Sequence, residues 1–408
     1  MPGMDAATEA PAWRRDRPVL VTEAQTIGSV AIIRSLGRAG YPVHACSQEA
    51  DALGFQSRYA GYRAHCPSYE SSEFPGWLRD YVARHGLSAI VPGEGFLLAI
   101  RSQFDEFAPL LPLNQDLSLV YSGMSKFDLF ESLTNAARAN HPAGANLPPS
   151  LLVRRGDRLP QAGELDALPL PMFLKVDGCY GRDGSGSANH KAASVGEAQA
   201  ILADLLRRYD RVLVQGYVPG RGAGAFFLNW NNEILASFAH LRLHEVPHTG
   251  GVSSYRTSWR HDAILKDAEA KLRRIGWQGV AMMEYRWNPA EDTFALMEMN
   301  GRFWGSLHLA LYAGVDFPSL MLDTFHGRPP VKPVRKWAVV RCRNTFPKDV
   351  QYVWSCLKDP GLGFGPRLWA VLEFLFLFFD LKGKSDLNFP GDRKLYWIRL
   401  WRFLKTRA

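Results

Sequence analysis

The chain has 408 residues, of which 47% are hydrophobic and 22% are charged, as in an ordinary globular protein with room for two or three subdomains. The formal net charge is +8, but residues 331–408 alone carry sixteen Lys/Arg and six Asp/Glu, a local net charge of +10. The first 330 residues therefore carry about −2. Because this main body is not basic, the composition argues against a nucleic-acid-binding protein.

The cysteines and the first residues bear on the cellular compartment. The five cysteines are odd in number and form no C-x-x-C pair, which favours reduced thiols over disulfides or a zinc site. They are Cys46, Cys66, Cys179, Cys342 and Cys356. Residues 1–16 lack the apolar stretch of a secretory signal, and we interpret them as a disordered lead. These features predict a cytoplasmic protein.

Short apolar runs alternate with helical patterns in the first hundred residues. The expected strands are Pro18–Thr22, Pro42–Ser47 and Ser88–Pro92, and the expected helices are Val30–Ala39 and Phe74–His85. This alternation predicts a small parallel, doubly wound sheet. No G-x-G-x-x-G follows the first strand, so the sequence does not indicate a dinucleotide site.

The loop Pro92–Gly95 follows the third expected strand, where open α/β sheets bind ligands. Glu94 in this loop is a candidate for substrate contact, although an ordinary loop carboxylate is the simpler interpretation. Further on, Ser125 opens an expected helix that ends near Arg138, and a linker rich in Pro, Gly and Asn covers residues 140–149.

A glycine-rich loop, Asp177–Gly186, follows an expected strand at Pro171–Val176. Its four glycines in ten residues let backbone N–H groups approach phosphate oxygens closely, and Lys175 at the strand end offers a positive charge. The spacing is not that of a P-loop, and glycine-rich surface turns are common. The loop alone is therefore weak support for phosphate binding.

Regular elements continue between residues 194 and 275. They are a helix Val195–Tyr209 capped by Ser194, strands Arg211–Val218, Ala225–Trp230 and Glu233–Arg242, a loop His244–Ser254, and a helix Asp262–Ile275.

Two apolar runs, Val280–Trp287 and Thr293–Asn300, are separated by a turn-forming sequence and predict a hairpin. Folding it about residue 291 places Glu284 opposite Glu298, with Asn300 on the same face. Two facing carboxylates repel each other, and a divalent cation between them removes the conflict. The alternative is a solvated hairpin with ordinary surface acids, which the flanking apolar residues argue against.

Taken together, residues 18–330 resemble the ATP-grasp superfamily, in particular its carbamoyl-phosphate-synthase-like carboxylate–amine ligases. The resemblance rests on six motifs in the family's order: SKFDLF, PMFLKVDGCYGRDGSG, VLVQGYVPG, RLHEVPHTGGVSS, GVAMMEYRW and LMEMNGRFWGS. It implies an α+β chain with a Rossmann-like domain at 17–115, a two-lobed ATP-grasp domain at 116–330 and a basic C-terminal extension at 331–408.

The resemblance also implies roles for individual residues. Lys126 and Lys175 would contact nucleotide phosphates, and Glu284, Glu298 and Asn300 would hold Mg²⁺ or Mn²⁺. A loop containing Gly178, Gly181, Gly184 and Gly186 would close over the phosphates. The backbone of Gln215, Gly216, Tyr217 and Val218 would recognise adenine.

Arg302 lies beside Phe303 and Trp304, where a charged side chain needs an anionic partner. The resemblance implies that it stabilises the transferred phosphoryl group, with Lys175 as the second catalytic residue. Arg242, His248, Gly250 and Gly251 lie on or beside the loop expected to bind the substrates, although a structural role for the histidine is equally consistent with the sequence.

The chemistry implied is attack of a carboxylate on the γ-phosphate of ATP, followed by attack of an amine on the acyl-phosphate. It needs positioning and charge neutralisation, which lysines, an arginine and Mg²⁺ supply. The family's acidic nucleotide contacts are missing at Gly216 and near Gly222–Gly224. The alternative is therefore a catalytically silent ATP-binding regulatory or scaffold protein.

The C-terminal extension allows two interpretations. Leu368–Leu381 is intensely apolar but shorter than the roughly 20 residues that span a bilayer. It is either a helix packed on the body or, with the basic segment Arg393–Arg407, an interfacial helix on anionic lipid. The sequence thus leaves open peripheral membrane contact through residues 366–408, as well as a homodimer. The expected partners are small-molecule carboxylates and amines.

Overall fold

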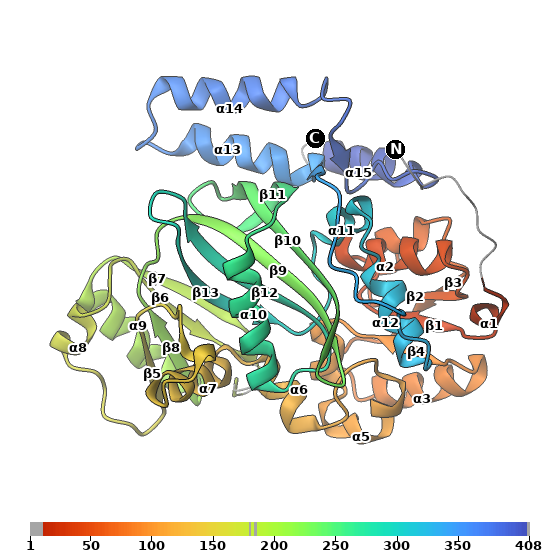
Figure 1. The fold of residues 1–408 in the computed structure, drawn as a ribbon, viewed down its shortest axis with the longest axis horizontal. Coiled ribbons are helices and arrows are strands. Elements are labelled where there is room, and N and C mark those ends of the chain that lie inside the picture. Colours follow the sequence, from red (N-terminus) through yellow and green to blue (C-terminus); the bar gives the residue numbers. More distant parts are fainter. Residues whose placement is uncertain (1–10, 179–180, 183–185, 406–408) are drawn as a thin grey trace. The chain divides into compact units, whose positions relative to one another are not determined.

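The computed structural model describes residues 11–178, 181–182 and 186–405. The chain forms two compact units, whose helices and strands are labelled in Figure 1. Unit 1 comprises residues 1–115, 235–260 and 302–408, and unit 2 comprises residues 116–234 and 261–301. These units differ from the three linear segments expected from the sequence, because residues 235–260 and the C-terminal extension fold with the first 115 residues.

Unit 1 begins with a four-stranded parallel sheet in the order β3-β2-β1-β4. Its strands are β1 (Val19–Val21), β2 (Val43–Ser47), β3 (Tyr62–His65) and β4 (Ala89–Val91), and its main helices are α2 (Ile27–Arg38) and α3 (Phe74–His85). The predicted parallel sheet is confirmed. The edge strand β3 was not predicted, because only Ala64 of its four residues is buried and the others give no apolar pattern. Since β1 lies between β2 and β4, the carboxyl ends of β1 and β4 flank the point where the strand order reverses.

Unit 1 also contains a second group of strands and most of the remaining helices. They are β10 (Glu233–Val246), β11 (Val252–Ser258), β14 (Arg341–Arg343), β15 (Lys384–Ser385), α4 (Glu94–Ala99), α5 (Phe104–Phe107), α11 (Leu307–Ala313), α12 (Phe317–Phe325), α13 (Val350–Lys358), α14 (Phe364–Phe376) and α15 (Lys394–Lys405). Strand β11 pairs antiparallel with both β10 and β14.

Unit 2 contains a small antiparallel sheet in the order β5-β8-β6-β7 and three longer antiparallel strands. The small sheet comprises β5 (Ser150–Arg154), β6 (Met172–Val176), β7 (Ala188–Ala192) and β8 (Arg211–Gln215); the longer strands are β9 (Arg221–Trp230), β12 (Gly279–Asn288) and β13 (Thr293–Asn300). The helices are α6 (Leu117–Met124), α7 (Lys126–Arg138), α8 (Ala162–Asp166), α9 (Val195–Arg208) and α10 (Asp262–Ile275). Apolar side chains of α9 and the small sheet form one buried cluster.

Residues 11–16 are more ordered than the sequence led us to expect. Residues 1–10 lie outside the described part, but Ala12–Arg15 form a helical turn, α1, in which Arg14 forms an ion pair with Asp323. The expected disordered lead therefore does not extend to residue 16. Among the helices that the structure describes, none has both the length and the apolar character needed to cross a bilayer.

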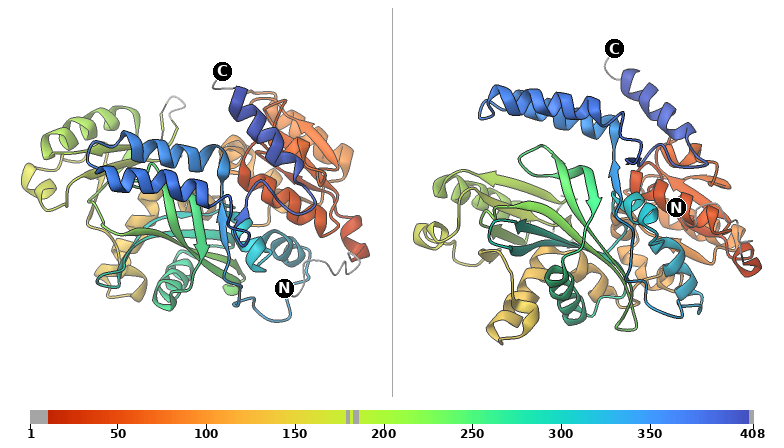
Figure 2. Two further views of the ribbon diagram at one scale, coloured as in Figure 1. Left: turned by 90° about the horizontal axis from the view of Figure 1, so that it is seen from above. Right: turned by 45° about the horizontal axis from the view of Figure 1, so that its top comes forward.

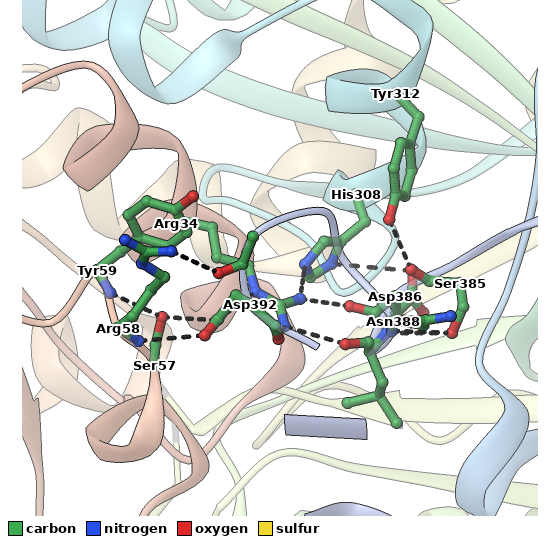
Figure 3. Close-up of polar contacts among 12 residues, drawn as sticks. Arg34, Ser57, Arg58, Tyr59, His308, Tyr312, Ser385, Asp386, Asn388 and Asp392 are labelled. Atoms are coloured by element: carbon green, nitrogen blue, oxygen red, sulfur yellow. Dashed lines mark hydrogen bonds and ion pairs between the residues drawn. The ribbon is translucent and has the colours of Figure 1, made fainter. Parts of the chain in front are cut away.

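The C-terminal extension is joined to the N-terminal sheet domain by a buried polar network (Figure 3). At its centre lies Arg34 of α2, whose side chain is fully buried. All five of its N–H donors have acceptors: Nε bonds to the Asp392 carboxylate at 2.9 Å, and the terminal nitrogens bond to His308 Nε2 and to the carbonyl oxygens of Asp386, Leu387 and Asp392. The loop between α14 and α15 is thus bonded directly to the core of unit 1.

Both carboxylates of this network are also satisfied. Asp392 accepts hydrogen bonds from Ser57 Oγ at 2.8 Å and the Arg58 N–H at 3.1 Å, besides the bond from Arg34. Asp386 forms a bidentate ion pair with Arg256 of β11, whose side chain is likewise buried. Buried charges are tolerated when they are paired and hydrogen-bonded, as Arg34, Asp386 and Asp392 are, whereas the Nε of Arg256 has no hydrogen-bond partner.

Candidate functional site

The β12–β13 hairpin of unit 2 carries the first group of predicted site residues. Glu284 pairs with Glu298 across the two strands, which confirms the predicted register. The pairing is not the result of a regular hairpin. Near the turn Asn288 pairs with Thr293, and a regular ladder from that pair would place Glu284 opposite Met297. A β-bulge at Met297 adds one residue to β13, and only this bulge puts Glu298 on the same face as Glu284.

The side chains of Glu284 and Glu298 both contact Asn300. Its Nδ2 donates to Glu284 Oε1 at 3.1 Å and to Glu298 Oε1 at 3.4 Å, so an amide group lies between the two carboxylates. Two carboxylates and one amide are hard oxygen donors of the type that Mg²⁺ binds together with phosphates and waters. The described residues contain no group of three or more His, Cys, Asp or Glu that could hold a metal. A Mg²⁺ bound here would therefore need nucleotide oxygens to complete its coordination.

Lys126 is the first residue of α7, and its ammonium group faces the hairpin. Its Nζ lies 3.8 Å from Glu298 Oε2 and 3.7 Å from Asp177 Oδ1. Asp177 is buried and fixes the start of this helix, because its Oδ2 accepts hydrogen bonds from Ser125 Oγ and the Phe127 N–H. Ser125 in turn caps the helix by accepting from the N–H of Asp128. The orientation of Lys126 is thus set by its own helix end.

Lys175 lies on β6 and forms the second positive charge of the same cluster. Its Nζ donates to Gln215 Oε1 at 2.6 Å and to the carbonyl oxygen of Met297, the bulge residue, at 3.4 Å. Burial lowers the pKa of Lys175 to about 8, although Glu298 favours its charged form. Burial alone would raise the pKa of Glu298, but the positive charges of Lys126 and Lys175 outweigh it and lower that pKa below its ordinary value.

The predicted phosphate loop is only partly described. Gly184 lies outside the described residues. The N–H of Gly178 donates to Ser187 Oγ at 2.9 Å, Gly181 forms an isolated bridge with Tyr209, and the carbonyl of Gly186 accepts from the Tyr209 hydroxyl at 2.6 Å. The described part of the loop is therefore held to the end of α9.

The predicted adenine-binding segment follows β8. The N–H of Gly216 donates to the Pro149 carbonyl and that of Tyr217 to the Pro169 carbonyl, both at 2.9 Å. These two N–H groups are engaged within unit 2, so the carbonyl oxygens of the segment and the N–H of Val218 are the better candidates for a nucleobase. A Cβ on Gly216 would lie 2.6 Å from Pro169 Cδ, so this position has no room for the glutamate that the resemblance leads one to expect.

Arg302 belongs to unit 1 and has a protein carboxylate as its anionic partner. Its Nε and Nη2 donate to Glu94 Oε2 at 3.1 and 3.0 Å. Glu94 opens α4, directly after β4, so it is more than the ordinary loop carboxylate that the sequence suggested. Beside it lies Glu23, which has a left-handed backbone with φ of 54° and accepts from the N–H of Phe96. Burial raises the pKa of Glu23, and Arg302 opposes this shift.

The predicted substrate loop lies between β10 and β11 in unit 1. Arg242 donates to Glu245 Oε1 at 3.2 Å and to the Gly251 carbonyl at 2.8 Å, which fixes the two ends of the loop to each other. The loop turns tightly: Gly250 has a φ of 131°, and a Cβ on Gly251 would lie 2.2 Å from the Val246 carbonyl oxygen. Both glycines are thus required by the backbone.

His248 in the same loop is bonded to the C-terminal extension. Its Nε2 lies 2.8 Å from Asp359 Oδ2, and its Nδ1 and backbone N–H both contact Ser355 Oγ. These contacts fit the structural role that the sequence left open. The prediction of a substrate role for His248 has no direct geometric support.

Three residues of these clusters were missed as functional candidates. Asp177 follows the strand that carries Lys175, so its position offered a signal. Glu23 lies two residues after the carboxyl end of β1, which is also a place where α/β sheets bind ligands. The carbonyl of Met297 offered none, because a β-bulge in the middle of an apolar run has no local sequence signature.

Comparisons with known proteins agree with this architecture. Residues 211–345 match the family model described as ATP-grasp in the biosynthetic pathway with Ter operon. Among curated protein sequences, none matches this chain.

Solved structures match over most of the chain. An L-amino acid ligase from Bacillus licheniformis has a TM-score of 0.54 at 14% identity, covering 76% of this chain and 74% of that one. An N5-carboxyaminoimidazole ribonucleotide synthetase from Thermus thermophilus has a TM-score of 0.55 at 16% identity, with coverages of 78% and 80%. A biotin carboxylase–β,γ-ATP complex from Campylobacter jejuni has a TM-score of 0.57 at 14% identity, with coverages of 77% and 72%. Residues 211–345 therefore match an ATP-grasp family model, and the chain shares the fold of these solved structures.

Proposed function

We propose that the protein is an ATP- and Mg²⁺-dependent ligase that activates a carboxylate as an acyl-phosphate and couples it to an amine. The observation that carries the proposal is the cluster in unit 2, where Lys126 and Lys175 face Glu284, Glu298 and Asn300. Two ammonium groups suit nucleotide phosphates, and two carboxylates with an amide suit a divalent cation. Few other ligands need both sets within one cluster.

The residues have the following proposed roles. Lys126 and Lys175 neutralise the phosphate oxygens of ATP, and Lys175 is largely protonated at neutral pH because its pKa is about 8. Glu284, Glu298 and Asn300 would hold Mg²⁺ or Mn²⁺, which supplies charge neutralisation between the phosphates when bound. Gly178, Gly181, Gly184 and Gly186 cover the phosphates, and Gln215–Val218 receives the adenine.

The reaction proceeds in two displacements. A carboxylate oxygen of the first substrate attacks the γ-phosphorus, the bond from that phosphorus to the β–γ bridging oxygen breaks, and ADP leaves. The amine then attacks the acyl carbon, phosphate leaves with the electron pair of the C–O bond, and the amine loses a proton. Arg302 is the proposed donor to the transferred phosphoryl oxygens, with Glu94 fixing its guanidinium.

The substrates are proposed only by class. Arg242 and the glycine turn at Gly250 and Gly251 are the proposed contacts for a small carboxylate or amine substrate, with His248 supporting the loop. Two proteins of similar structure, an L-amino acid ligase and an N5-carboxyaminoimidazole ribonucleotide synthetase, bear names that are consistent with carboxylate and amine chemistry. Amino acids and small carboxylic acids are therefore the first substrates to test.

One observation favours the rival function, a catalytically silent ATP-binding protein. Gly216 has no room for an acidic side chain, and Gly222 and Gly224 of β9 supply none near the ribose. Such a protein would retain nucleotide binding without turnover. The paired carboxylates at Glu284 and Glu298 argue against it, because they are costly to keep together unless a cation uses them.

The deciding experiment measures ADP release by the purified full chain with Mg²⁺-ATP across pools of amino acids and small carboxylic acids. We expect one pool to stimulate ADP release, and the Glu298→Gln variant to lose that stimulation. The matched control is Glu291→Gln, which removes an exposed carboxylate at the tip of the same hairpin. Tight ATP binding without stimulation by any pool would favour the silent protein, and failure to bind ATP would overturn both proposals.

A further inference from the structure

The C-terminal extension of unit 1 has an outer surface that the ligase proposal does not use. Helix α14 and the turn after it expose a continuous row of large apolar side chains, with Phe379 81%, Phe376 60% and Trp369 59% exposed. At 100° per residue, positions 364, 368, 369, 375 and 376 of α14 fall on one side of a helical projection and form a single face, and the exposed Phe379 follows in the turn after the helix. The members of the row are Phe364, Leu368, Trp369, Leu375, Phe376 and Phe379. We call this the α14 face.

The opposite side of α14 carries its charges and packs on unit 1. Glu373 forms an ion pair with His244 of β10, and Arg367 donates to the Asp359 carbonyl. Phe374 lies under the guanidinium of Arg343 at 5.4 Å. The two charged side chains of α14 and the apolar Ala370 and Phe374 therefore face the rest of unit 1, and the helix still exposes a second apolar face to solvent.

Helix α15 repeats this arrangement with tryptophans. Trp397, Trp401 and Leu404 lie at i, i+4 and i+7 and are 66%, 58% and 58% exposed. Exposed lysines, Lys394 and Lys405, stand at the two ends of the helix. Tryptophan beside lysine is the combination typical of a helix that lies in the lipid headgroup region.

The charge of the extension adds a second observation. Residues 331–408 carry a net charge of +10, and the acidic residues are mostly engaged inside unit 1. Five of the six acidic side chains pair with an arginine or histidine of unit 1: Asp349, Asp359, Glu373, Asp386 and Asp392. Exposed basic side chains of the extension, Lys394 and Lys405 among them, therefore face solvent, whereas Arg402 of α15 is paired with Asp51 and Arg399 lies near Glu49.

We propose that the α14 face and the Trp397–Trp401–Leu404 row form one docking surface for an anionic lipid bilayer. Apolar side chains would enter the headgroup and upper acyl region, while basic side chains contact anionic headgroups, each typically adding to the affinity. Both Figure 1 and Figure 2 show α13 and α14 lying side by side as a helical pair, and a row of protruding aromatic side chains suits a bilayer better than it suits an extended peptide. The inference goes beyond the proposed ligase and does not rest on it.

The buried network around Arg34 gives this surface a rigid support. It bonds the loop at Asp386–Asp392, which joins α14 to α15, to helix α2 of the N-terminal domain. Helix α15 packs through Leu395 against Val30 and Leu53. The two rows are therefore fixed parts of unit 1.

The test is co-sedimentation of the full chain with vesicles of phosphatidylcholine alone or with 30% phosphatidylglycerol, a composition chosen as about one anionic lipid in three. We expect binding only to the anionic vesicles, and weaker binding as NaCl increases, because salt screens the basic side chains. The double variant Trp369→Ser/Phe376→Ser should lose roughly 100-fold in partitioning, about tenfold for each aromatic side chain removed.

Matched controls separate this result from misfolding and from the ligase proposal. Leu159→Ser/Val339→Ser removes two exposed apolar side chains elsewhere and should bind vesicles like the unmodified chain. The surface variant should keep its melting temperature and ATP binding, whereas Glu298→Gln should keep vesicle binding. Absence of binding to anionic vesicles, or equal binding by the surface variant, would overturn the proposal. A dimer in sedimentation velocity that the surface variant abolishes, without vesicle binding, would assign the surface to a second copy instead.

Discussion

The molecule contains two clusters of charged residues, and they are built on opposite principles. Around Arg34 in unit 1, each of its five donors has an acceptor, and its carboxylate partner Asp392 is buried and fully bonded. Around Lys175 in unit 2, like charges stand together: Lys126 lies near Lys175, and Glu284 lies beside Glu298. The ion pairs there are long, at 3.7 and 3.8 Å.

The difference separates a structural network from a binding site. A fully bonded buried network stabilises one arrangement, and removing one partner leaves a costly charge. A cluster with like charges and long contacts costs folding free energy, which the rest of the fold must supply. Its charges are balanced when negatively and positively charged ligands, such as phosphates and a cation, bind there. His308 illustrates the first type: burial, and then the charges of Arg34 and Arg256, lower its pKa far below the ordinary value, which keeps it neutral.

The largest expected effect on stability comes from breaking the network. In Asp392→Ala, Arg34 would remain buried without its carboxylate, so the free energy of unfolding should fall by about 3–5 kcal/mol. Denaturant unfolding followed by circular dichroism measures this. The control Asp51→Ala removes the exposed partner of Arg402 and should cost less than about 1 kcal/mol. Similar losses for the two variants would contradict the comparison.

The largest expected effect on turnover comes from the cluster in unit 2. Glu298→Gln keeps the size of the side chain but removes the charge that binds the cation, so stimulated ADP release should fall about 100-fold. Its free energy of unfolding should fall by only about 1 kcal/mol, because the lost attraction to Lys126 and Lys175 is partly offset by relief of the repulsion from Glu284. A loss of stability comparable with that of Asp392→Ala would show that Glu298 belongs to a structural network.

The lowered pKa of Lys175 predicts that ATP affinity depends on pH, a dependence that the network around Arg34 does not produce. Phosphates bind the protonated form of Lys175, so ATP affinity should fall as the pH rises through about 8, by up to tenfold between pH 8 and 9. Titration calorimetry at pH 7, 8 and 9 measures this. Lys175→Arg stays charged over this range and should show a much smaller change. An unmodified chain with constant affinity up to pH 9 would exclude the phosphate role.

The lowered pKa of Lys175 also affects the stability of the protein without ATP, and in the opposite direction with pH. The folded pKa of Lys175 lies below its unfolded value of about 10.4, so the unfolded chain binds more protons between these values. Its contribution to the free energy of unfolding should therefore increase as the pH rises from about 8 to about 10. Relative to Lys175→Met, this slope is measurable by denaturant unfolding, and a slope of the opposite sign would contradict the lowered pKa.

The smallest effect is expected at His248. Its ring bonds to Ser355 and Asp359 of the extension, so His248→Ala should lower the free energy of unfolding by about 1 kcal/mol and leave the Michaelis constants nearly unchanged. Arg242→Ala, on the same loop, is the comparison and should raise the Michaelis constant for one substrate. A rise of several-fold in His248→Ala would restore the substrate role predicted for it.

Local sequence patterns were enough to predict most helices and strands, but not the contacts that position the site residues. Three strands of the first sheet, β1, β2 and β4, and the existence of the β12–β13 hairpin follow from apolar periodicity and turn composition, which are properties of neighbouring residues. The bulge at Met297, the contact of Asp177 with the start of α7 and the pairing of Arg302 with Glu94 depend on residues distant in sequence. The exposed apolar face of α14 could not be predicted either, because the sequence of an apolar run does not show which side of the helix packs on the protein.

The bulge at Met297 also has a bearing on how this hairpin can change over evolutionary time. The turn at residues 289–292 lies outside the paired registers, so it can gain or lose residues without moving Glu298. One residue lost between Phe294 and Glu298 would instead direct Met299 to where the carboxylate lies, and one residue gained would direct Met297 there. The tip of the hairpin is thus open to length variation and to inserted labels, whereas residues 295–297 form a segment whose length must be kept.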